Sequence, residues 1–217
     1  MRRIHWLWWM AVGGTLLVVA ATAWSLPDLP ERVPTHWNIR GQIDAYGPKS
    51  SLWILPATMG VMIAMFAVMP LISPKPFDLD TNRGVLRQMM IIIVAMIAYI
   101  HWVSLLAASG IKLPIDRTLV AGICLFLALI GNVMGKIKRN LYMGIRTPWT
   151  IANDRVWADT HRLGARLFVG AGLLGVAICV VLPPIFAIMP ILLAGVFLVL
   201  YSYILYQRLE RRGEIPS

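Results

Sequence analysis

The sequence predicts an all-α, polytopic membrane protein with about six transmembrane helices. Of its 217 residues, 59% are hydrophobic and 14% are charged, whereas soluble domains carry about 25% charged residues. Six apolar runs are close to the length of about 20 residues that a helix needs to cross a bilayer. Short segments of alternating apolar and polar residues do not recur, so a membrane β-barrel is not indicated.

The predicted spans follow one another along the whole chain. The first run contains no charged residue, and together with Arg2-Arg3 and Ala21-Thr22-Ala23 it also fits a signal peptide. It is longer than a usual signal core and five further spans follow, so we expect an uncleaved helix. Arg166 lies near the start of the fifth span, where its long side chain can reach the membrane interface. The expected spans are residues 6–26, 51–73, 88–109, 118–135, 163–182 and 185–207.

The distribution of Lys and Arg predicts the orientation of the chain. Fifteen of the twenty, among them Arg2, Arg3 and Lys75, lie on the side that holds the N-terminus. Because inner loops carry the excess of basic residues, both termini are expected in the cytoplasm. The net charge of +10 is then explained by contact with anionic membrane lipid, and direct binding of nucleic acid is not expected.

The expected outer loop is residues 27–50. Its four prolines and two glycines argue against a regular helix. The loop has two interpretations, a compact cap at the membrane interface, which the sequence physics favours, and a recognition surface for a ligand or peptide. The candidate binding residues on this side are His36, Trp37, Asn38, Asp44, Tyr46 and Lys49.

The expected inner loop, residues 135–164, is the most chemically specific part of the chain. It is rich in Lys and Arg between two apolar runs. Gly144 and Pro148 interrupt any helix that continues from the fourth span. Thr147 is a good cap residue for a new short helix that has Pro148 at its first position.

A second helix is expected to begin after Asn153 in the inner loop. Asn153 can cap it, and Asp154 complements the positive end of the helix dipole. Trp157 and His161 are four residues apart and share one face. We expect an amphipathic helix that lies on the inner membrane face, with Trp157 buried in the interface.

Patterns for catalysis or metal binding are missing from the sequence. It contains no H-E-x-x-H, no Gly-x-Ser-x-Gly and no P-loop. Cys124 and Cys179 fall in apolar runs without metal or redox spacing. The four histidines lie in separate parts of the predicted topology, and His101 is interpreted as a hydrogen-bonding residue between helices. We therefore expect neither an enzyme nor a metal or other cofactor.

The inner loop carries G-N-x3-K-x-K-x-N-x3-G-I-R-T-P-W-T from Gly131, followed by V-W-x2-T-H-R-L-G from Val156. This combination resembles the SdpI family of bacterial membrane immunity proteins. The outer loop, with Val33-Pro34 and His36-Trp37-Asn38, is similar to a small uncharacterised domain that precedes the SdpI region in longer members. Two domains are therefore expected, residues 1–73 with the outer loop, and residues 74–217 as an SdpI-like region of four spans.

The resemblance implies a protein of the bacterial cytoplasmic membrane that gives immunity to a secreted, membrane-active peptide toxin. It also implies a receptor that holds a DNA-binding repressor at the membrane while toxin is present. The toxin would meet the outer loop, and the repressor would meet the basic inner loop. The inner motif residues, with a structural or partner-binding role, are Asn132, Lys136, Lys138, Asn140, Arg146, Thr147, Pro148, Trp149, Trp157, His161 and Arg162.

Our structural hypothesis for the inner loop is a fixed platform at the inner leaflet. It would consist of Arg146 and of one face formed by Trp149, Trp157 and His161. The alternative function for the whole chain is a small-molecule or ion transporter or channel. Asn132, His101 and the glycines of the fourth and fifth spans favour transport, although small residues equally serve tight helix packing. The lack of visible repeats and of charges deep in the spans speaks against it.

Overall fold

The computed structural model describes residues 5–74 and 79–215, so Arg2, Arg3 and Lys75 lie outside the described residues. Within that part of the chain, six helices are long and apolar enough to cross a membrane. The prediction of a polytopic α-helical membrane protein is confirmed. The helices are α1 (His5–Ser25), α2 (Ile54–Ile72), α3 (Arg83–Ala108), α4 (Ile115–Met134), α5 (Pro148–Ala152), α6 (Asp154–Val181) and α7 (Met189–Arg211).

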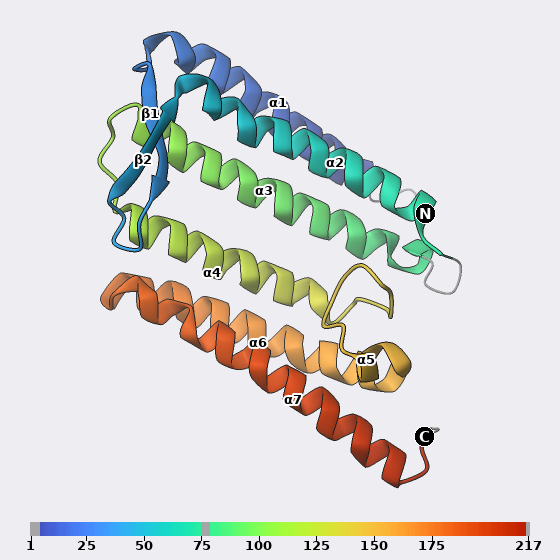
Figure 1. Cartoon of the computed structure of the whole chain (residues 1–217). Helices are drawn as coiled ribbons and strands as arrows, with labels where there is room; N and C mark the ends of the chain where they lie inside the picture. The colour runs from blue at the N-terminus through green and yellow to red at the C-terminus, as the bar shows by residue number, and fades with distance from the viewer. Residues whose placement is uncertain (1–4, 75–78, 216–217) are drawn as a thin grey trace.

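The six long helices run between two ends of different character (Figure 1). One end carries a β-hairpin, and the opposite end carries the short helix α5 together with both ends of the chain (Figure 1). Many large apolar side chains point outward along the spans, such as Trp24 and Leu71, which are more than four-fifths exposed. Such surfaces are what lipid chains cover in a bilayer, since soluble proteins rarely expose large apolar patches.

The outer loop forms a two-stranded antiparallel hairpin, which the all-α prediction did not include. Its strands are β1 (Arg32–Trp37) and β2 (Ile43–Pro48). The side-chain oxygen of Asn38 closes the turn by accepting the N–H groups of Arg40 (2.9 Å) and Gln42 (3.1 Å). Alternation along each strand is obscured by proline and glycine, which explains why the strands were missed.

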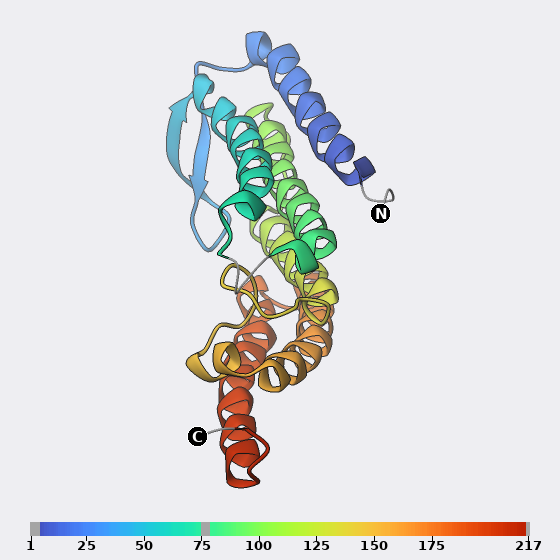
Figure 2. The same cartoon turned by 90° about the vertical axis from the view of Figure 1, so that its right-hand side faces the viewer.

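The hairpin is fixed to the bundle through strand β1. Val33 is fully buried and packs in a cluster with Leu29, Leu52, Leu105 and Ala108 at the outer end of the bundle. Figure 2 shows the hairpin alongside the outer part of α2. Strand β2 is almost entirely exposed, so the hairpin has one packed strand and one solvent-facing strand.

Glycine lets α4 and α6 approach each other closely. A Cβ added at Gly172 would lie 2.5 Å from the carbonyl oxygen of Cys124, and one at Gly131 would lie 2.7 Å from the Cβ of Phe168. Gly122 and Gly175 are in equally tight contacts, whereas a Cβ at Gly170 would meet nothing within 4 Å. Four of these five glycines therefore serve helix packing, as small residues do in membrane bundles.

Helix α3 connects the two halves of the bundle, since it packs against α1 and α2 on one side and α4 on the other. His101 of α3 is completely buried, and its Nε2 lies 2.8 Å from the hydroxyl of Thr22 in α1. The interpretation of His101 as a residue that hydrogen-bonds between helices is confirmed. Its position near the outer end, far from Asn132 at the inner end of α4, means that the two residues do not line one polar path.

The expected separate amphipathic helix after Asn153 is wrong. Asn153 does cap a helix, but α6 continues without interruption from Asp154 to Val181. Its 28 residues make it about 42 Å long, whereas the apolar core of a bilayer is about 30 Å thick. The helix therefore extends beyond the membrane, and its charged first turns need no separate surface helix. Trp157 is buried in protein, not in the interface, because it faces the inner loop.

We predict that Gly172→Ala destabilises the protein by about 1–3 kcal/mol, because the new methyl group collides with the backbone of α4. The matched control is Gly170→Ala in the same helix, where the methyl group meets open space. The measurement is the thermal unfolding midpoint of both variants in detergent. We expect a lower midpoint only for Gly172→Ala, and equal midpoints would contradict the close approach of α4 and α6.

Candidate functional site at the inner end of the bundle

The inner loop, residues 135–153, is folded around a buried asparagine. The Asn140 side-chain oxygen accepts the N–H groups of Tyr142 (2.7 Å) and Met143 (2.8 Å), and its amide nitrogen donates to the carbonyl of Lys138 (2.8 Å). Asn140 is completely buried. One side chain thus provides hydrogen-bond partners for three backbone groups of a tight turn that has no regular secondary structure.

A second buried asparagine, Asn82, ties this turn to the rest of the bundle. It lies at the start of α3, where its side-chain oxygen accepts the N–H of Lys138 (2.8 Å) and its amide donates to the Lys138 carbonyl (3.1 Å). Sequence reasoning missed Asn82, because an asparagine before a helix is indistinguishable from an ordinary cap residue.

Trp157 and His161 form the buried contact between α6 and the inner loop. Their rings stack with centroids 4.1 Å apart, and the Trp157 indole N–H donates to the carbonyl of Ile137 (2.7 Å). The two nitrogens of His161 are both bonded to backbone. Nε2 accepts the N–H of Ile145 (2.9 Å), and Nδ1 lies 2.8 Å from the Trp157 carbonyl. Because a carbonyl only accepts and an N–H only donates, His161 is neutral with its proton on Nδ1.

Gly144 is required where the loop crosses the His161 ring. Its φ is +108°, and an added Cβ would lie 2.2 Å from His161 Nε2 and 3.2 Å from the Trp157 ring. The glycine of the Gly-Ile-Arg-Thr-Pro-Trp segment therefore permits both the backbone turn and the contact with the ring.

Helix α5 is fixed between the inner loop and α7. Thr147 and Thr150 form the predicted cap and complete it as a capping box, with Pro148 at the first position. The Trp149 indole N–H donates to the hydroxyl of Ser202 in α7 (2.5 Å), and its ring meets Tyr203 edge-on. Trp149 thus packs in a different cluster from Trp157 and His161, so the three do not form the single face that the hypothesis required.

We use the name inner platform for residues 136–152 together with Trp157 and His161. Its buried side is the network above, and its exposed side carries basic residues. Arg146 lies on the exposed side but donates to the Leu141 carbonyl. A surface hollow of about 470 Å³ lies between the start of the inner loop and the first turns of α6. It is lined by Lys136, Lys138, Arg139 and Arg162 and by Asp154. Arg139 is paired with Asp154 (2.6 Å) and Arg162 with Asp159, which leaves the ammonium groups of Lys136 and Lys138 exposed.

Asn132, the first polar residue of the motif, is not part of this network. It is exposed near the inner end of α4. The remaining ten motif residues are brought together at the inner end, in buried, capping or surface positions.

The candidate residues of the outer loop lie on the hairpin at the opposite end of the bundle, except Lys49, which directly follows β2. His36 Nδ1 is 2.5 Å from Asp44 Oδ1, and both side chains are largely exposed. Lys49 pairs with Glu31 (3.0 Å), and Asn38 forms the turn. Tyr46 is exposed on β2, while Trp37 is half-buried.

Two groups at the inner end that could serve catalysis are instead held in structural hydrogen bonds. The lone pair of His161 is occupied by a backbone N–H, and the hydroxyl of Thr147 belongs to the α5 cap. Across residues 5–74 and 79–215, no three His, Cys, Asp or Glu side chains group in a way that could hold a metal ion.

Six apolar spans and a folded, basic inner loop define a polytopic membrane protein with a structured platform at one end. Comparison with known families then shows what the chain is similar to. Residues 136–206, which contain the platform, match the SdpI/YfhL protein family, and residues 13–60 match a domain of unknown function, DUF1648. The resemblance to the SdpI family that the sequence predicted is thus confirmed over this part of the chain.

A curated relative supports the same assignment. Immunity protein SdpI of Bacillus subtilis (strain 168) is 24% identical over 144 residues, which are 66% of this chain and 67% of that protein. No solved structure matches the chain. The match supports a membrane immunity role, in a bacterial multi-pass membrane protein.

We predict that Gly144→Ala loosens the inner platform, because it combines a strained backbone with a collision against His161. The matched control is Gly110→Ala, where φ is also positive (+81°) but a Cβ meets nothing within 4 Å. Trypsin added to inside-out vesicles should cleave the loop of the Gly144 variant several times faster than the loop of the control. Equal cleavage rates would show that the contact with His161 does not hold the loop.

Proposed function

We propose that this protein is an immunity protein of the bacterial cytoplasmic membrane that protects the cell from a secreted, membrane-active peptide toxin. The observation that carries the proposal is that the stretch matching SdpI/YfhL contains the entire inner platform, and that the 24% identical relative is an immunity protein. The closed packing of the platform supports this function over transport. Its buried side chains Asn140, Thr150 and His161 bond to the backbone of the loop, so these polar groups are not free to bind a solute.

The outer hairpin is the proposed contact for the toxin. Strand β1 is fixed to the bundle by Val33, so the exposed groups of the hairpin are presented on a rigid base. The pair of His36 and Asp44 combines a donor and an acceptor on the exposed surface, with the aromatic ring of Tyr46 nearby on β2. These groups suit a peptide, which offers backbone hydrogen bonds and apolar side chains.

The exposed side of the inner platform is the proposed contact for a DNA-binding repressor. Lys136 and Lys138 have exposed ammonium groups that pair with no carboxylate among the described residues, and the backbone of Lys138 is fixed through Asn82 and Asn140. A fixed positive surface favours a partner with a complementary acidic surface. In this proposal the repressor is held at the membrane only while toxin occupies the outer hairpin.

The outer contact is tested by survival of a toxin-sensitive bacterium that expresses the protein and is challenged with culture supernatants of toxin-secreting strains. We expect His36→Ala and Asp44→Ala to lower survival, because each removes half of the exposed pair. Arg40→Ala, an exposed change in the same hairpin, is the control and should protect like the unchanged protein. If all three variants protect equally, the hairpin pair does not meet the toxin.

The inner platform is tested in the same survival assay with Arg146→Ala. This change removes the bond that holds the 141–146 turn, so we expect survival to fall to that of cells without the protein, at an unchanged amount in the membrane fraction. Arg166→Ala removes another exposed arginine of the inner side and serves as the control. Full protection by the Arg146 variant at normal expression would contradict the role of the platform.

A further inference from the structure

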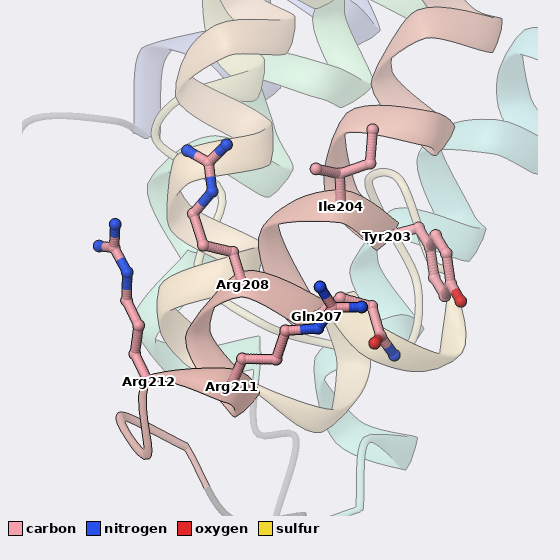
Figure 3. Close-up of a pocket in the computed structure, with 6 residues that line it drawn as sticks. All are labelled: Tyr203, Ile204, Gln207, Arg208, Arg211 and Arg212. Atoms are coloured by element: carbon pink, nitrogen blue, oxygen red, sulfur yellow. The ribbon is translucent and has the colours of Figure 1, made fainter.

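The last two turns of α7 carry a basic hollow that the proposed function does not use. It measures about 430 Å³, and the six side chains that line it are drawn in Figure 3: Tyr203, Ile204, Gln207, Arg208, Arg211 and Arg212. In Figure 3, Arg208 and Arg212 extend in the same direction from the end of the helix. The opposite face of these turns is buried, because Leu209 packs against Val156 of α6 and against Ile215.

Two arginines of this hollow have no carboxylate partner among the described residues, unlike Arg139, Arg155 and Arg162. Arg139, Arg155 and Arg162 are paired with Asp154, Glu214 and Asp159, and Arg212 lies 3.8 Å from Glu214. Among the described residues, no carboxylate pairs with Arg208 or Arg211. Glu210 is the nearest carboxylate in sequence, but it is turned about 160° around the helix from Arg208 and about 100° from Arg211.

The position of the hollow along α7 matches the boundary between lipid chains and headgroups. Exposed apolar side chains continue along the helix up to Leu200, Tyr203 and Ile204. Arg208 begins one turn later, about 6 Å further along the axis. A tyrosine followed by arginine at the end of a span is the usual arrangement at a membrane interface.

We propose that this hollow binds the phosphate of an anionic phospholipid, whose acyl chains lie along the apolar face of α7. The guanidinium groups of Arg208 and Arg211 donate to the phosphate oxygens, since arginine matches the geometry of phosphate. A lipid explains the site better than an acidic protein, because the arginines and the apolar residues Leu200 and Ile204 lie on one continuous exposed face. The site is independent of the proposed immunity function.

The test uses the full-length chain purified in dodecyl maltoside and mixed with equal amounts of dioleoylphosphatidylglycerol and dioleoylphosphatidylcholine. Native mass spectrometry then counts the lipid molecules retained by each protein. We expect the unchanged protein to prefer phosphatidylglycerol, and Arg208→Gln/Arg211→Gln to reduce that preference by on the order of tenfold. The charge-matched control is Arg40→Gln/Lys112→Gln on the outer side, which should keep the preference.

Three outcomes would overturn the proposal. The first is an unchanged preference for phosphatidylglycerol in the Arg208/Arg211 variant, which would indicate that the two arginines bind a protein partner instead. The second is an equal loss in the outer control, which would mean attraction by net charge alone. The third is displacement of the lipid by glycerol 3-phosphate at the same concentration, which would define a site for free phosphate compounds. A second variant, Arg208→Lys/Arg211→Lys, is used if the double glutamine variant does not fold. It should keep the thermal stability of the unchanged protein but bind phosphatidylglycerol more weakly. Unchanged binding by this variant would also overturn the proposal.

Discussion

The close approach of α4 and α6 is the constraint on which the inner end of the molecule depends. Glycines at 131 and 172 remove the side chains that would otherwise hold the two helices apart. The loop that follows α4 can then contact the first turns of α6, where Ile137 accepts the Trp157 indole N–H and Ile145 donates to His161. A wider spacing of the helices would separate both pairs of atoms. Helix packing inside the membrane therefore determines a surface outside it.

The platform is stabilised by hydrogen bonds more than by regular secondary structure. Only residues 148–152 of the connection between α4 and α6 are helical. Backbone groups of Lys138, Tyr142, Met143 and Ile145 are instead satisfied by completely buried side chains, namely those of Asn82, Asn140 and His161. A buried polar group that lost its partner would cost about 1–3 kcal/mol, so these bonds favour a single conformation of the loop. This fixed shape is what presents Lys136 and Lys138 in a constant geometry.

Local chemistry allowed much of the fold to be predicted from the sequence. The spans follow from hydropathy, and the caps Thr147 and Asn153 follow from the bonds that these side chains make to the next turn. Long-range partners could not be predicted, because no local pattern specifies them. Asn82 bonds to a residue 56 positions away, and Trp149 turns toward Ser202 instead of Trp157. The expectation that α6 would be divided failed because the length of a helix beyond the membrane is not limited by the bilayer.

The side chains that hold the inner platform in place are made at different times as the chain is synthesised. Asn82 emerges first, Asn140 follows after α3 and α4, and Trp157 and His161 arrive only with α6. Until α6 is made, the carbonyl of Ile137 and the N–H of Ile145 have no side-chain partners in protein and are satisfied by water. The inner loop is thus completed late in biogenesis, after the helices on both sides have been inserted. A ribosome that stalls before residue 157 leaves the spans of α1 to α4 made but the inner loop without the two bonds to α6.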